Sequence, residues 1–113
     1  MNLYHVELGL PPGFALPGDR VNLRWTNHAE HARTSDRYGV IPKVSTLPLS
    51  VFSVIEVGME GRRVAKVVVR GSLNKTQDAI FVLIPGSEWT VKTVWINEKN
   101  DQHKTLDRSR YVC

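Results

Sequence analysis

Two strands and the turn between them can be read directly from IFVLIPGSEWTVKTVWI, residues 80–96. Ile80 to Ile84 form a continuous apolar run, which is typical of a central strand covered on both faces. Pro85 and Gly86 then predict a turn. From Trp89 to Ile96 one set of side chains (Trp89, Val91, Thr93 and Trp95) alternates with a second set (Thr90, Lys92, Val94 and Ile96). This alternation predicts a second strand.

Two more strands are predicted before this hairpin. The segment Val51–Val57 is rich in β-branched residues, and Val64–Arg70 follows a glycine-containing turn at residues 59–62. The polar stretch Gly71–Asp78 is expected to be a loop. Because all four strands follow one another with short connections, we expect them to form an antiparallel meander.

The first part of the chain is organised differently. Alternating segments predict strands at residues 4–8 and 21–26, and two clusters of proline and glycine at residues 11–13 and 17–19 predict a loop between them. The 113 residues are the length of one domain. Within this single domain, 1–113, we expect an N-terminal strand and Pro/Gly-rich loop over residues 1–20 and a polar C-terminal segment over 98–113.

One helix is predicted between the early strands and the meander. Asn27 at the N-cap and Glu30 three positions later read as a variant capping box. The helix is expected from His28 to about Tyr38, with Gly39 as the left-handed residue after its end. Its sheet-facing side would carry Ala29, Ala32 and Asp36. The fold class is therefore α+β, with one helix in the N-terminal half packed on an antiparallel sheet of four or more strands.

Composition excludes several classes of protein. Hydrophobic residues make up 42 % of the chain, which argues against intrinsic disorder. No apolar run approaches the roughly 20 residues that span a bilayer, and no signal-peptide pattern opens the chain. Cys113 is the only cysteine, so a disulfide framework and a multi-cysteine zinc site are excluded within one chain. We expect a cytoplasmic protein without a membrane partner.

The charge balance favours an anionic partner. Lys and Arg number 15 against 11 acidic residues, a formal charge of +4. Nucleic acid is the commonest anionic partner, although this charge is also ordinary for a small domain that only needs to stay in solution. The candidate nucleic-acid-binding residues are Arg33, Arg37, Lys66, Arg70, Lys92, Lys104, Arg108 and Tyr111. The competing interpretation is that these residues are simply solvated.

The histidines offer two kinds of chemistry. His28 and His31 lie three positions apart on the predicted helix and could bind zinc, but no third ligand can be named, so no metal or other cofactor is expected. His28 would instead lie near the sheet, whose strands carry Lys66, Arg70, Lys92 and Thr93. A basic sheet face with a histidine above it could hold an RNA phosphate.

One family has this order of features. A strand precedes a helix that opens with His28-Ala29 and is followed by Arg33 and Arg37-Tyr38-Gly39, and the last strand contains VKTVW, residues 91–95. From about Trp25 to Tyr111 the chain resembles the superfamily of small RelE- and BrnT-type toxins. That superfamily shares a metal-independent ribonuclease fold with barnase and the colicin-type ribonucleases.

The resemblance implies an endoribonuclease that uses side chains alone. The RNA 2′-hydroxyl would attack the adjacent phosphate, which requires a base, an acid and cations on the phosphorane. By this resemblance His28 is the acid/base, Lys66 and Arg70 bind the phosphate, and Thr93 is an orienting donor. His103 and His31 are alternatives for proton transfer. The partners would be RNA and an antitoxin.

A second class of function stays open. The chain can also be a non-catalytic phage or mobile-element accessory protein that binds nucleic acid or a host protein. An enzyme needs His28 and the strand cations to converge within a few ångströms, whereas a binding protein needs only a basic face.

Overall fold

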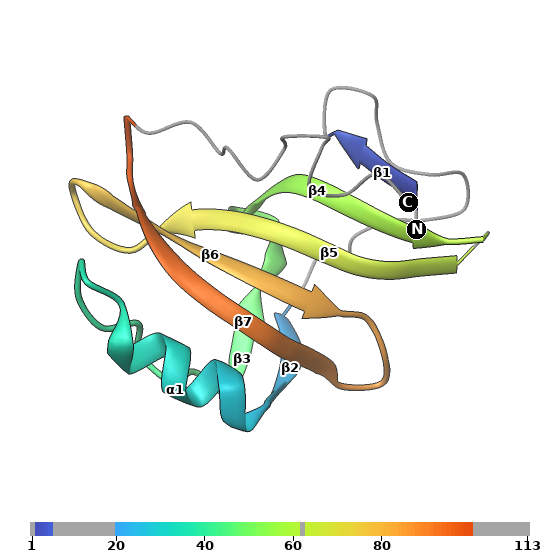
Figure 1. Ribbon diagram of the computed structural model, residues 1–113, viewed down its shortest axis with the longest axis horizontal. Helices are drawn as coiled ribbons and strands as arrows, with labels where there is room; N and C mark the ends of the chain where they lie inside the picture. Colours follow the sequence, from blue (N-terminus) through green and yellow to red (C-terminus); the bar gives the residue numbers. More distant parts are fainter. Residues whose placement is uncertain (1, 6–19, 62, 101–113) are drawn as a thin grey trace.

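The computed structural model describes residues 2–5, 20–61 and 63–100. This part of the chain contains one α-helix, one 3-10 turn and seven strands (Figure 1). In chain order they are β1 (Asn2–His5), β2 (Arg20–Trp25), α1 (Asn27–Ser35), β3 (Thr46–Pro48), η2 (Leu49–Val51), β4 (Ser53–Glu60), β5 (Arg63–Ser72), β6 (Gln77–Ile84) and β7 (Trp89–Glu98).

The strands form one mixed sheet in the order β1-β4-β5-β6-β7-β2-β3. The meander of β4 to β7 is antiparallel throughout, as expected. However, β2 pairs in parallel with the start of β7, Leu23 opposite Trp89 and Trp25 opposite Val91. The expectation of a purely antiparallel sheet is therefore wrong. Alternation along β2 indicates a strand but does not indicate its partner, which is more than sixty residues away.

The helix continues where β2 leaves the sheet. Only Thr26 separates the two elements, and α1 then runs beside the rest of β7 (Figure 1). The N-cap is Thr26, whose Oγ1 accepts the Ala29 amide at 3.0 Å, so the assignment of Asn27 as the cap is wrong. Both residue types favour this position.

The helix is also shorter than expected. It ends at Ser35 because Asp36 adopts an extended backbone and its carboxylate accepts the amides of Tyr38 and Ile96, each at 2.9 Å. Gly39 does have a positive φ of 145°, but it lies in the turn beyond Asp36. The small residues face the sheet as predicted, since Ala29 is fully buried and Ala32 packs against the core.

The sheet is apolar on both faces near its centre. The larger core cluster takes Phe81 and Leu83 from β6, and a smaller cluster takes Ile80 and Val82 from the same strand. This confirms the prediction that Ile80–Ile84 is a central strand covered on both sides, although Ile84 at its end is exposed. We call the side that carries Ile80 and Val82 the second face.

Two short elements had no clear signal in the sequence. The segment β3 and the turn η2 carry Leu47 and Leu49, both buried in the larger cluster. These two leucines join Val21 and Leu23 of β2 in that cluster, and β3 pairs with β2. The polar segment predicted as a loop is also shorter than expected, because β5 extends to Ser72 and β6 begins at Gln77.

Candidate functional site

The candidate site is organised around an irregularity in β7. The β6–β7 pairing passes from Val82 opposite Thr93 to Leu83 opposite Val91, so Lys92 is an extra residue in β7. Such a β-bulge bends the strand and redirects the neighbouring side chains. Because Thr93 is paired with Val82, its side chain lies on the second face.

His28 meets Thr93 at this bulge. The histidine lies exposed in the first turn of α1, and its Nε2 is 3.2 Å from Thr93 Oγ1. The two residues are 65 positions apart in the chain. Their contact follows from the path of the chain, since α1 starts directly beside the bulge, where the Thr26 amide donates to the Val91 carbonyl at 3.4 Å.

The bond to Thr93 leaves the other ring nitrogen of His28 for a ligand. If the Thr93 hydroxyl donates to Nε2, the neutral ring carries its proton on Nδ1. If Nε2–H donates to Thr93, Nδ1 has a free lone pair and can accept a proton. In either arrangement, the contact with Thr93 orients the imidazole ring of His28.

Two lysines, one on β7 and one on β5, carry charges that affect each other. Lys92 is exposed and directly precedes Thr93, while Lys66 comes from β5. Burial lowers the pKa of Lys66 below its ordinary value of 10.5; the Glu56 carboxylate opposes this shift, and the charge of Lys92 adds to it. The two ammonium groups therefore interact electrostatically. We call His28, Thr93, Lys92 and Lys66 together the His28–Thr93 site.

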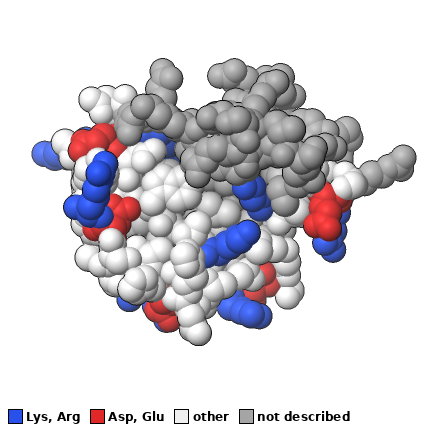
Figure 2. All heavy atoms as spheres, viewed as in Figure 1, with Lys and Arg blue, Asp and Glu red and all other residues white. Residues whose placement is uncertain are grey.

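Lys66 is only partly available to a ligand. Its Nζ lies 3.8 Å from Oε2 of Glu56, a carboxylate with no exposed surface. Figure 2 shows that Lys and Arg side chains on the displayed face are interspersed with Asp and Glu instead of gathering in one patch. Phosphate binding at this site would thus depend on individual lysines, Lys92 above all.

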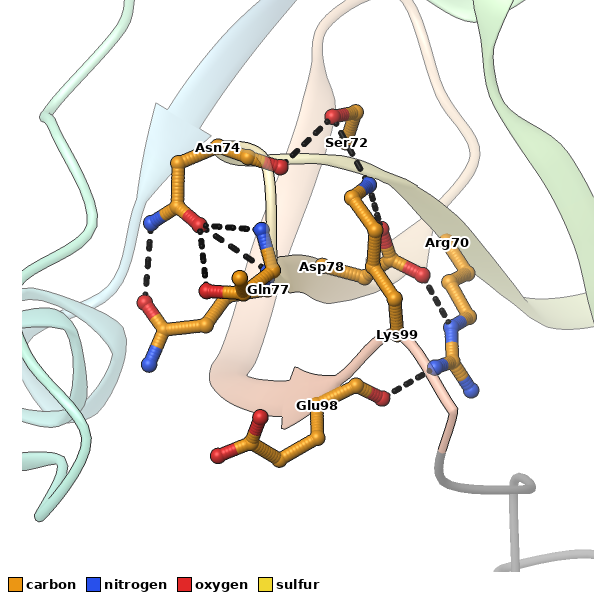
Figure 3. Close-up of polar contacts among 8 residues, drawn as sticks. Arg70, Ser72, Asn74, Gln77, Asp78, Glu98 and Lys99 are labelled. Atoms are coloured by element: carbon orange, nitrogen blue, oxygen red, sulfur yellow. Dashed lines mark hydrogen bonds and ion pairs between the residues drawn. The ribbon is translucent and has the colours of Figure 1, made fainter.

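Arg70 does not belong to the site. Its Nε donates to Asp78 Oδ2 at 2.7 Å and its Nη2 to the Glu98 carbonyl at 2.9 Å (Figure 3). Lys99 Nζ binds the other oxygen of Asp78 at 2.6 Å and Ser72 Oγ at 2.9 Å. Arg70 and Lys66 share one strand, as expected, but about 13 Å of strand separates them. The Arg70 guanidinium is therefore already bound to Asp78 of β6 and to the Glu98 carbonyl at the end of β7. These contacts join β5, β6 and β7.

The other predicted cations lie elsewhere. Arg33, in the last turn of α1, donates to the Ile41 carbonyl at 3.3 Å, and its Nε lies 3.9 Å from Glu30. Arg37 donates to the Tyr38 hydroxyl at 2.6 Å and lies over its ring. Arg33 lies at the end of α1 opposite His28, and Arg37 lies in the turn beyond that end. His103, Lys104, Arg108 and Tyr111 lie outside the described residues.

Thr26 is the residue beside the candidate site that the sequence did not single out. Two adjacent residues, Thr26 and Asn27, are both good caps, so the sequence alone could not decide between them. An available signal was the position of Thr26 at the end of the alternating strand pattern, directly before the helix.

Residues 20–61 and 63–100 contain no group of three or more His, Cys, Asp or Glu side chains that could hold a metal ion. In the same part of the chain, no helix is long and apolar enough to cross a membrane. Comparison with known proteins finds no matching family model, no matching curated relative and no matching solved structure.

Proposed function

We propose that this protein binds RNA and cleaves it without a metal ion at the His28–Thr93 site. The observation that carries this proposal is the 3.2 Å contact between His28 Nε2 and Thr93 Oγ1, with the exposed Lys92 next to Thr93. It brings together a proton-transfer group, an orienting hydroxyl and a cation. An exposed site also suits a long polymer, which can lie across the surface.

The chemistry follows from these groups. His28 takes the proton from the RNA 2′-hydroxyl, whose oxygen forms a bond to the adjacent phosphorus while the bond to the 5′-oxygen breaks. Lys92 neutralises charge on the phosphorane, and Lys66 adds a smaller contribution because it is also paired with Glu56. The leaving 5′-oxygen takes up a proton, for which His103 is the candidate donor. The products carry a 2′,3′-cyclic phosphate and a 5′-hydroxyl.

The relationship to the RelE- and BrnT-type toxins is part of this proposal and rests on the order of elements alone. A helix that opens with His28 is followed by the four-stranded meander β4 to β7. An antitoxin that covers the His28–Thr93 site is the partner implied by this relationship, and the cytoplasm is the compartment.

One observation favours a non-catalytic RNA-binding protein as the second candidate. Two of the strand cations expected to hold phosphate are engaged with carboxylates, Arg70 with Asp78 and Lys66 with Glu56. The two carboxylates neutralise part of the positive charge that would stabilise a phosphorane. The remaining cations can still bind an intact phosphodiester, which carries less negative charge.

The two candidates are separated by comparing two histidines of one helix. His28→Ala should lower the rate of RNA cleavage about 10²–10⁴-fold, because a positioned proton-transfer group contributes that much. Thr93→Val should cause a smaller loss. His31→Ala is the matched control: this histidine is equally exposed and lies three residues along α1, so the variant should cut at the parental rate.

Each outcome decides between the candidates. Circular dichroism and urea denaturation confirm that the variants are folded. If folded His28→Ala cuts as fast as the parent, His28 has no role in the chemistry. If the parent binds RNA with a steep salt dependence but leaves it intact, the protein is the binding protein of the second candidate.

A further inference from the structure

We infer that Thr26 is the positioning residue of the His28–Thr93 site, because its single hydroxyl ties the start of α1 to the bulge of β7. The placement of His28 against Thr93 would then depend on Thr26. The consequence for catalysis rests on the proposed function, whereas the consequence for the His28 ring does not.

The contacts of Thr26 join two elements that carry the two halves of the site. Its Oγ1 accepts the Ala29 amide at 3.0 Å, which fixes the first turn of the helix. The same oxygen donates toward the carbonyls of Val91 at 3.1 Å and Lys92 at 3.4 Å. These carbonyls belong to the residues at the bulge, directly before Thr93.

Only a hydroxyl can make this set of bonds from one atom. It has one proton to donate and lone pairs to accept with, so one oxygen can serve the helix amide and the strand carbonyls together. A carboxylate at the same position is acceptor-only. It can still cap the helix, but it faces the Val91 and Lys92 carbonyls without a proton to share and repels them.

Short sequence separations link the bonds of Thr26 to the position of His28. The histidine lies two residues after Thr26 in the same helical turn, and Thr93 lies one residue after Lys92. A shift of the helix start away from the bulge moves one member of the pair and not the other. A displacement of about 1 Å at a catalytic group can cost about 10²-fold in rate.

Three substitutions separate capping from positioning. Thr26→Ser keeps the hydroxyl and should preserve the site. Thr26→Asp keeps the cap, and on helix stability alone should be as good as threonine. Thr26→Val removes both functions. Because Thr26→Asp also adds a negative charge near His28, Asn27→Asp is the matched control: it places the same charge one residue further along the exposed start of α1.

The first measurement is the nitrogen NMR spectrum of the His28 ring in the full chain. In the parent, in Thr26→Ser and in Asn27→Asp, the two ring nitrogens should show distinct shifts that mark one favoured tautomer held by Thr93. In Thr26→Asp the shifts should move toward the averaged values of a free histidine. Where the parent cleaves RNA, kcat of Thr26→Asp should fall about 10²-fold with a smaller change in KM.

Thr26→Asp is the decisive variant, and Thr26→Val adds to it where it folds. If the His28 ring signals of folded Thr26→Asp match those of the parent, Thr26 is a helix cap and no more, and the inference is wrong. If the ring signals move as expected but the parent cuts no RNA, the inference stands and the proposed function fails.

Discussion

At the scale of the residue, two threonine hydroxyls arrange the candidate site. Thr26 connects α1 to the bulge of β7, and Thr93 holds one nitrogen of His28. The sequence predicted that His28 would lie near the sheet, and the structure places its ring in contact with Thr93 of β7. The sequence did not predict that Arg70 would be bound by Asp78, because that ion pair depends on the register of β5 and β6.

Asp78 makes a pH-dependent contribution to stability. Burial alone would raise the pKa of this carboxyl, but the hydrogen bonds and charges of Lys99 and Arg70 outweigh burial and hold the pKa below its ordinary value of 3.8. A lowered native pKa means that the stabilisation is complete above 3.8 and is lost as the pH falls through the native value.

Asp78→Asn should therefore lower the free energy of unfolding at pH 7 by about 1.5–3 kcal/mol, the usual range for hydrogen bonds to a charged group. The deficit should shrink as the pH falls below 3.8, because the parent loses the same interaction. Urea denaturation at several pH values measures both effects, with Glu88→Gln as an exposed control. A deficit that is constant with pH would show that the charge of Asp78 is irrelevant.

At the scale of the element, α1 is fixed to β7 at both ends. Thr26 holds its start, and Asp36 holds its end by accepting the Ile96 amide. The meander was predictable because its strands are long, patterned and consecutive. The segment β3 was not, since it has three residues, one of them Pro48, and among the described strands it pairs with β2 alone. The parallel pairing of β2 also depends on contacts that are remote in sequence.

Asp36→Ala should loosen the end of α1. The change removes the acceptor of the Ile96 amide and should cost about 1–3 kcal/mol if that group is left without a partner. Amide hydrogen exchange should become faster at Ile96, while the Val68 amide on β5 serves as the internal control. Asp36→Asn keeps one side-chain oxygen and should restore part of the protection. Unchanged exchange at Ile96 in Asp36→Ala would contradict the docking of the helix by this residue.

At the scale of the whole molecule, the larger core cluster and the candidate site lie on different faces of the sheet. The larger core cluster lies on the side of Phe81 and Leu83, and the His28–Thr93 site lies at the edge where α1 meets the second face. The coarse α+β class, one helix with a sheet, could be predicted from periodicity, but the mixed pairing of the sheet could not. The contact of His28 with Thr93 could not be derived from it, because that contact depends on how β2 and α1 are placed against β7.

Lys92 should dominate the electrostatics of RNA binding. Lys92→Ala removes an exposed cation beside Thr93, and should weaken RNA binding and reduce the slope of log affinity against log salt by about 1. Lys75→Ala is the matched control, since this lysine is equally exposed but lies in the loop between β5 and β6. Binding measured by fluorescence anisotropy at several salt concentrations gives the slopes. Equal slopes for the two variants would place the RNA elsewhere.

The central claim is that side chains alone cut RNA through its own 2′-hydroxyl. The most direct measurement is mass spectrometry of the fragments left by the purified chain from a short single-stranded RNA in excess EDTA. We expect a 2′,3′-cyclic phosphate on one fragment and a 5′-hydroxyl on the other, and no cleavage of a 2′-deoxy version of the same oligonucleotide. Cleavage abolished by EDTA, or fragments with a 5′-phosphate and a 3′-hydroxyl, would indicate attack by a metal-bound water and contradict the account.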